Sequence, residues 1–160
     1  MSYLLDTDAI SQLSKDLPHQ GVLGWLETVD LESVYLSVIT LAELRRGIEL
    51  LPNGKKKLAL EDWLQHTVTA AYDGRILPVD AGVADLAGRL GAKAKSEGSN
   101  VELADVLIAA TAVTHCLAVV TLNRKLFERL GVKLVDLWCL GPEGNSLGRE
   151  PKLLRSPGQR

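Results

Sequence analysis

Short apolar segments alternate with longer amphipathic segments along most of this chain. Apolar runs of strand length occupy residues 3–5, 34–37, 75–79, 118–122 and 132–137. Apolar residues spaced as in helices recur from residue 9 and over 18–29, 40–51, 55–71, 81–95, 102–115 and 125–130. The alternation predicts an α/β fold, with a central parallel sheet of about five short strands and helices on both faces.

Polar residues mark where several of these helices should begin. Asp8 and Asp80 are placed to cap the helices that follow them. Residues 40–43 and 99–102 match the capping box, in which a hydroxyl and a carboxylate each bind a backbone amide at the helix start. On this interpretation Glu43 helps to cap its own helix, and Asp105 lies well inside the helix that begins at residues 99–102.

The pattern ends after Leu140, where Gly, Pro, Ser, Asn and basic residues continue to Arg160 without an apolar period. A chain of 160 residues suits one domain. We therefore expect one folded domain over residues 1–140 and a flexible tail over 141–160.

Composition narrows the class of protein. Hydrophobic residues make up 46% and charged residues 24%, as in ordinary globular proteins. No apolar run approaches the roughly 20 residues that cross a bilayer, and Asp6 and Asp8 stand where a signal peptide needs its apolar stretch. We expect a cytoplasmic protein without a membrane partner, whose Cys116 and Cys139 are reduced and mostly buried.

Acidic residues supply the candidate chemistry. Ligands of open α/β sheets bind beyond the carboxyl ends of the strands, where Asp6 and Asn123 each follow an apolar run. Asp6 can still be a helix cap, although Asp8 is better placed for that duty. Asp105 precedes a run of apolar helix positions, where a carboxylate is costly unless it is paired or bound to a metal.

The types of residue favour a hard cation. His19, His66 and His115 lack the spacing of zinc ligands, so oxygen ligands are expected. Mg²⁺ is usually held by one or two carboxylates together with waters and substrate phosphates. Glu102 lies on the same helical face as Asp105, so it is either a fourth acid of the site or only the helix cap. The net charge of −2 does not by itself indicate a nucleic-acid binder.

Four segments, in this order and spacing, resemble the PIN-domain nucleases, and especially the VapC-like toxins of bacterial toxin–antitoxin pairs. They are YLLDTDAIS at 3–11, LAELRRGI at 41–48, ADVLIAATA at 104–112 and TLNRKLFERLGV at 121–132. The resemblance covers about residues 2–140. It implies a PIN-like fold and an endoribonuclease that uses Mg²⁺ or Mn²⁺.

The resemblance also implies roles for individual residues and partners. Asp6, Glu43 and Asp105 fall on the metal-binding acids, and Asn123 falls on a fourth acidic or polar site residue. Thr121 and Asp8 match supporting positions, and Arg45, Arg46 and Arg124 are candidates for binding RNA phosphates. The implied partners are an RNA substrate, a small antitoxin and a second copy of the chain. Leu126 stands where the family often has aspartate, which puts the number of metals in doubt.

Two other functions fit parts of the sequence. Asp6-Thr7-Asp8 after an apolar run also resembles the nucleophile motif of haloacid dehalogenase-like phosphatases, in which Asp6 would carry the phosphate. That family also needs a lysine and a late acidic pair, which are not evident after Leu117. The third reading is a PIN-like binding module that has lost activity, which Leu126 makes conceivable.

Overall fold

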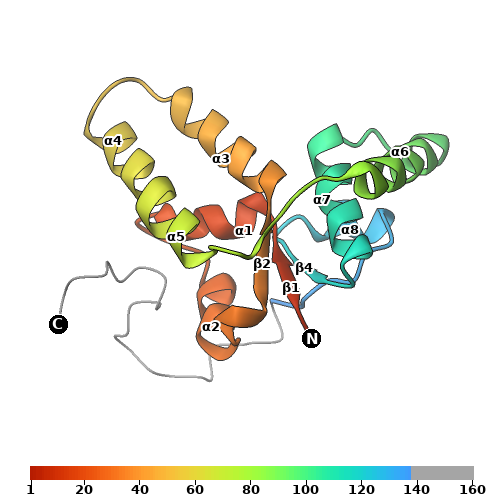
Figure 1. Cartoon of the computed structure of the whole chain (residues 1–160), viewed down its shortest axis with the longest axis horizontal. Helices are drawn as coiled ribbons and strands as arrows, with labels where there is room; N and C mark the ends of the chain where they lie inside the picture. The colour runs from red at the N-terminus through yellow and green to blue at the C-terminus, as the bar shows by residue number, and fades with distance from the viewer. Residues whose placement is uncertain (138–160) are drawn as a thin grey trace.

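A parallel sheet of four strands forms the centre of the molecule. In this computed structural model, which describes residues 1–137, the strands are β1 (Tyr3–Leu5), β2 (Val34–Ser37), β3 (Ile76–Leu77) and β4 (Ala118–Val120). Their order across the sheet is β3-β2-β1-β4, and every neighbouring pair is parallel (Figure 1). The α/β prediction is confirmed, whereas the expected tail at 141–160 lies outside the described residues.

The strand count is lower than expected. The segment 132–137 contributes one isolated bridge, between Leu134 and Val119, in place of a fifth strand. The strand expected at 75–79 keeps only two residues, because Pro78 has no amide proton to continue the ladder.

Helices connect the strands and follow the predicted segments. They are α1 (Thr7–Ser11), α2 (Gln20–Thr28), α3 (Val38–Glu49), α4 (Lys55–Asp62), α5 (Thr69–Ala71), α6 (Ala81–Ser96), α7 (Leu103–Thr114) and α8 (Arg124–Arg129). Two 3-10 turns, η1 (Gln12–Ser14) and η2 (Leu31–Ser33), complete the first half. The single helix expected over 55–71 contains a π-helical stretch, η3 (Trp63–Val68), between α4 and α5. None of the helices in residues 1–137 combines the length and the apolar character needed to span a bilayer.

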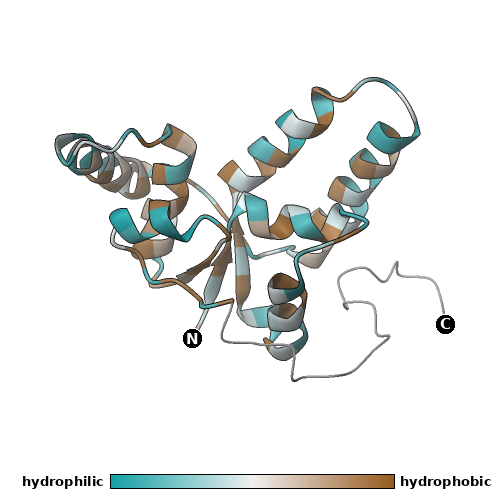
Figure 2. Ribbon diagram, turned by 180° about the vertical axis from the view of Figure 1, so that it is seen from behind, coloured by the Kyte–Doolittle hydropathy of each residue, from teal (hydrophilic) through white to brown (hydrophobic). Residues whose placement is uncertain are grey.

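The two faces of the sheet bury separate apolar clusters. Leu5, Val34 and Leu36 pack with α1, α2 and α3 on one face, whereas Leu4 and Val119 pack with α7 and α8 on the other. Alternate strand residues point to opposite faces, which explains this division. Figure 1 shows α1 to α5 on one side of the strands and α6 to α8 on the other, and in Figure 2 the helices carry brown and teal positions side by side. Helices on both faces are therefore confirmed.

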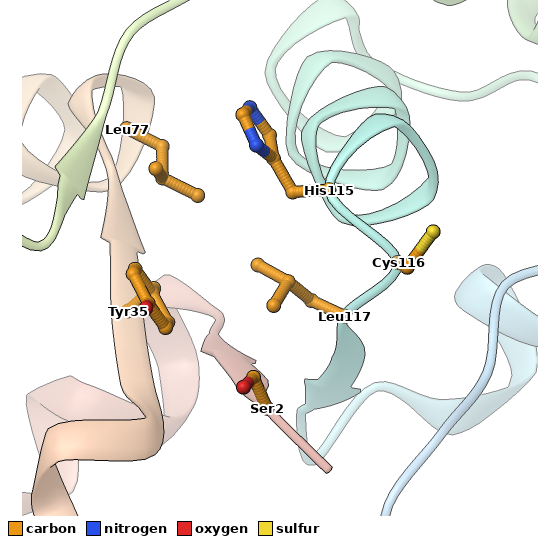
Figure 3. Close-up of a pocket in the computed structure, with 6 residues that line it drawn as sticks. All are labelled: Ser2, Tyr35, Leu77, His115, Cys116 and Leu117. Carbon is orange, nitrogen blue, oxygen red and sulfur yellow. The ribbon is translucent and has the colours of Figure 1, made fainter.

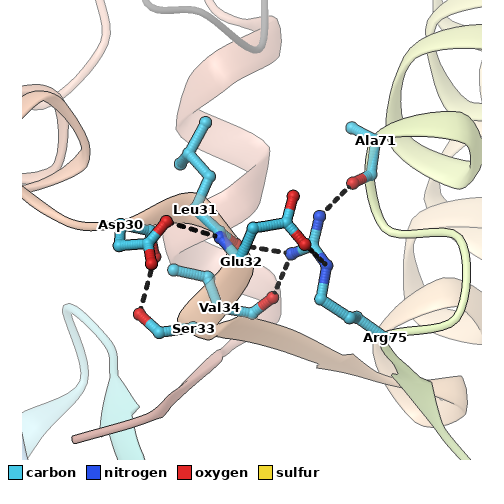
Figure 4. A network of polar contacts seen from close by, with 7 residues as sticks. All are labelled: Asp30, Leu31, Glu32, Ser33, Val34, Ala71 and Arg75. Carbon is cyan, nitrogen blue, oxygen red and sulfur yellow. Dashed lines mark hydrogen bonds and ion pairs between the residues drawn. The ribbon is translucent and has the colours of Figure 1, made fainter.

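One half-buried cation ties β2 to the segment before β3. The guanidinium of Arg75 donates to the carbonyl oxygens of Leu31, Val34 and Ala71, and it lies over the ring of Tyr72 at 5.1 Å (Figure 4). The Arg75 side chain is only 14% exposed, and its partner Glu32, at 3.8 Å, is largely exposed. The carbonyls, more than the carboxylate, hold this arginine in place.

Replacing Arg75 with alanine is expected to lower the free energy of unfolding by about 2–4 kcal/mol, because three carbonyl groups lose a charged donor. Urea unfolding followed by circular dichroism measures the change. Arg89 is a matched control, since its ion pair with Asp85 is exposed, and its replacement with alanine should cost under about 1 kcal/mol. Equal losses in the two variants would contradict the role assigned to Arg75.

Candidate active site

Asp6 lies at the turn between β1 and α1 and is 5% exposed. Its amide donates to the carbonyl of Val120 at 3.0 Å, which continues the pairing of β1 with β4. Its Oδ1 accepts the Thr7 amide at 2.8 Å, so Asp6 is the N-cap of α1. The prediction that Asp8 caps this helix was wrong, because the backbone is already helical at Thr7, two residues before the apolar pattern begins.

Thr121 joins the start of α1 to the end of β4. Its hydroxyl lies 2.9 Å from Asp6 Oδ2 and 3.3 Å from both carboxylate oxygens of Asp8. Asp8 Oδ1 also accepts the amide of Leu122 at 3.2 Å. Asp8 therefore fixes the chain that leaves β4, a duty that the sequence pattern did not indicate.

Glu43 reaches the same place from α3. The Ser37 hydroxyl caps this helix by accepting the Ile39 amide at 3.1 Å, so α3 begins before Thr40. The capping box expected at 40–43 is therefore wrong, and Thr40 is fully buried within the helix. The Glu43 carboxylate instead accepts a hydrogen bond from the hydroxyl of Thr7.

Asp105 lies in the first turn of α7. Glu102 is the N-cap residue, and its side chain makes no capping hydrogen bond, so the capping box expected at 99–102 is also wrong. Asp105 is consequently near the helix start and not well inside the helix. The helix dipole favours a carboxylate in a first turn. It therefore offsets part of the cost of placing the Asp105 charge on an apolar helix.

The acids repel one another. Burial raises the pKa of Asp6 to about 7, the charges of Asp8 and Asp105 add to the rise, and the donors Thr121 and Thr7 oppose it. Burial also raises the pKa of Asp105, as do the charges of Glu43, Glu102 and Asp8. Five acidic side chains therefore act on one another at the carboxyl end of β1.

This donor set fits a hydrated divalent cation. Carboxylate oxygens are the ligands that Mg²⁺ prefers, and a cation would offset both the burial and the repulsion that raise these pKa values. Within residues 1–137, no three His, Cys, Asp or Glu side chains already stand in positions that could hold an ion. Mg²⁺ tolerates this arrangement, because it usually binds one or two carboxylates and keeps several waters.

In the described part of the chain, the side chains of Asn123 and of the three candidate arginines make no hydrogen bond or ion pair with the acids of the cluster. The Asn123 side chain is exposed, and only its backbone amide takes part, donating to the Thr121 hydroxyl at 3.0 Å. Arg124 lies 3.5 Å from Glu128 and 3.3 Å from Asp136 in two ion pairs. Arg45 pairs with Glu49, whereas Arg46 is three residues after Glu43 and so lies on the same face of α3. Of the three arginines, Arg46 is best placed to meet a phosphate at the acids.

Two shallow pockets lie away from this cluster. One, of about 220 Å³, is lined by Ser2, Tyr35, Leu77, His115, Cys116 and Leu117 (Figure 3). The other, of about 350 Å³, lies between α3 and the η3–α5 segment and includes Arg45. Cys116 is exposed, so the expectation of a buried thiol was wrong for this residue, whereas Cys139 lies outside the described residues. No acid of the cluster lines either pocket.

Comparison with known proteins places the acids inside a matched region. The family model of the PIN domain matches residues 3–133. Toxin FitB from Neisseria gonorrhoeae is 42% identical over 135 residues, covering 84% of this chain and 97% of FitB. VapC ribonuclease Y4jK from Sinorhizobium fredii is 39% identical, covering 84% of this chain and 96% of its own length. The crystal structure of FitAcB from Neisseria gonorrhoeae matches with a TM-score of 0.79 at 42% identity, over 85% of this chain and 98% of that chain.

Proposed function

This chain belongs to the PIN domain family, and on that premise we propose that it is a metal-dependent endoribonuclease, the toxin of a toxin–antitoxin pair. The observation that carries the proposal is the gathering of Asp6, Asp105 and their acidic neighbours at one end of the sheet, where burial and then mutual repulsion raise the pKa values of Asp6 and Asp105. A relative that is 39% identical is named a VapC ribonuclease, and another is named a toxin. The first name supports RNA as the substrate, and the second supports a role as a toxin.

Each acid has a part in the proposed reaction. Asp6, Asp105 and Glu43 would hold Mg²⁺ or Mn²⁺, which when bound would supply Lewis acidity to a water and to the scissile phosphate. Glu43, on α3, would either complete this set of ligands or orient the attacking water. Asp8 and Thr121 keep Asp6 in place, and Glu102 adds negative charge beside Asp105. Arg46 binds a flanking phosphate.

The phosphatase alternative finds little support in the site. That phosphatase family also needs a lysine, and the charged groups that shift the pKa of Asp6 are both carboxylates. Asn123 lies after Leu117, where that family has its late acidic pair, and its side chain is neutral and exposed. Family membership and this electrostatic setting both favour the nuclease.

Purified, antitoxin-free protein is expected to cut total RNA when Mg²⁺ or Mn²⁺ is added and to stop when EDTA removes the metal. Gel electrophoresis of the RNA and restoration by excess Mn²⁺ measure the effect. The physical reason is that repelling carboxylates alone attract neither an activated water nor a phosphate. Metal binding without cleavage of any RNA would favour the inactive PIN-like module, and cleavage in EDTA would contradict the metal mechanism.

The proposed partners follow from the family. We propose that a small antitoxin protein blocks the acids until it is removed, and that the chain pairs with a second copy. Co-expression with a candidate antitoxin, followed by sedimentation of the complex and of the freed protein, tests both partners. A freed protein that sediments as one copy and still cleaves RNA would contradict the dimer.

A further inference from the structure

Thr7 contacts two of the three principal acids at once. Its backbone amide donates to Asp6 Oδ1 at 2.8 Å, and its hydroxyl donates to Glu43 Oε2. The two acids are 37 positions apart in the sequence and come from different elements, the β1–α1 turn and α3. Thr7 is half-buried at the first position of α1, so it stands between them.

The hydroxyl contact restricts a side chain that would otherwise be free to turn away. Glu43 reaches the cluster through three rotatable bonds from a half-buried position on α3, and its charge and that of Asp105 repel each other. A hydroxyl has one proton, and Thr7 gives it to Oε2 of Glu43. No hydrogen bond in the described part of the chain engages the other oxygen, Oε1.

The other two acids are held by different groups. Asp6 is fixed on both oxygens, by the Thr7 amide and by the Thr121 hydroxyl, and Asp105 is placed by the first turn of α7. Within residues 1–137, the Thr7 hydroxyl is the one hydrogen-bond donor to the Glu43 carboxylate. The orientation of Glu43 therefore depends on Thr7 more than on its own helix.

We propose that Thr7 is a positioning residue, which holds the Glu43 carboxylate through Oε2 and so leaves Oε1 available to a divalent cation. The proposal rests on the nuclease function proposed above, and it adds a residue whose side chain holds a metal ligand without touching the metal. Partners of this kind typically change metal affinity or activity 10- to 100-fold when they are removed.

The test compares three variants of the full chain. Thr7→Val keeps the branched shape and the backbone amide but removes the hydroxyl, and Thr7→Ser keeps the hydroxyl. Thr28→Val is the matched control, because within residues 1–137 the Thr28 hydroxyl bonds only the Trp25 carbonyl of its own helix. Binding of Mn²⁺ alone is measured by electron paramagnetic resonance of the free ion, and RNA cleavage is measured as kcat and KM at saturating Mn²⁺.

Thr7→Val is expected to bind Mn²⁺ about 10- to 100-fold more weakly than the unaltered chain and to lose a similar factor in kcat, with KM for RNA unchanged. Thr7→Ser should recover Mn²⁺ affinity to within about threefold, and Thr28→Val should match the unaltered chain. If Thr7→Val does not fold, Thr7→Ala takes its place in the same comparison.

Two results would overturn the role of Thr7. Unchanged Mn²⁺ affinity in Thr7→Val would show that Glu43 does not need the hydroxyl. Equal losses in Thr7→Ser and Thr7→Val would assign the effect to the shape of the side chain. Failure of the nuclease function is distinct, because the unaltered chain would then leave RNA uncut at every Mn²⁺ concentration, while the Mn²⁺ titration would still report on Thr7.

Discussion

Changing Asp6 or Asp105 to asparagine is expected to reduce RNA cleavage by more than about 100-fold while the fold is kept. Groups that only support a metal ligand cost up to about 100-fold when they are removed, and a direct ligand should cost more. Asparagine has nearly the size of aspartate but lacks its charge, so it binds a hard cation weakly. Initial cleavage rates at saturating Mg²⁺, on a substrate chosen from the total RNA assay, measure the loss.

The control for this prediction is Asp16→Asn. Asp16 is exposed, lies after η1 and does not contribute to the raised pKa of Asp6 or Asp105. Its change should leave cleavage within about twofold of the unaltered chain, because exposed substitutions away from a site have small effects. Near-normal cleavage by both site variants would rule out these acids as metal ligands.

Asp6→Asn is also expected to make the metal-free protein more stable at pH 8, by on the order of 2–4 kcal/mol. A tenfold change in proton affinity corresponds to about 1.4 kcal/mol. Ionised Asp6 therefore destabilises the fold, because its pKa is about 7 when folded and 3.8 in the reference state. Asparagine removes the charge and can still accept the Thr7 amide, so most of this cost should disappear.

The pH dependence follows from the direction of that pKa change. Between about pH 4 and pH 7 the folded protein binds more protons at Asp6 than the unfolded chain does, so this residue lowers the free energy of unfolding as pH rises. Below about pH 4 the residue is protonated in both states, and the advantage of Asp6→Asn should vanish.

Urea unfolding in EDTA at pH 8 and at pH 4 measures this difference. Asp80→Asn is the matched control, since Asp80 is also a helix N-cap, accepts the Val83 amide at 2.9 Å and is exposed. It should give no comparable gain at either pH. Added Mg²⁺ should then stabilise the unaltered chain more than Asp6→Asn, because the cation neutralises the charge that asparagine lacks. An Asp6→Asn protein that is less stable at pH 8 would contradict the cost assigned to burial.

The sequence predicted the elements better than their ends. The spacing of hydrophobic residues located β2 and most of α6 correctly. Each element buries one apolar face, and this burial determines where its hydrophobic residues recur. The capping boxes expected at 40–43 and 99–102 were wrong, because α3 begins at Val38 and the N-cap of α7 is Glu102, not Ser99. Local motifs of four residues carry too little energy to fix a helix start against tertiary packing.

The sequence predicted the acids of the candidate site, but it did not predict the hydroxyl groups that bind them. Asp6 and Asp105 stood out because a charge beside apolar residues needs a partner. The hydroxyls of Thr7 and Thr121 act across 36 and 115 positions, and no sequence pattern reports such contacts. The triplet Asp6-Thr7-Asp8 was the available signal for Thr7, and it was interpreted for its acids alone.

The hydrogen bond from Thr121 to Asp6 determines how late in synthesis on the ribosome the acidic site can form. Asp6, Glu43 and Asp105 are all synthesised before β4, whereas the hydroxyl that holds Asp6 and the amide that holds Asp8 arrive only with residues 121 and 122. While β4 is still inside the ribosome, the nascent chain carries every acid but lacks the strand that pairs with β1. An RNA-cutting site built in this way stays incomplete beside the ribosome's own RNA until nearly the whole domain has emerged.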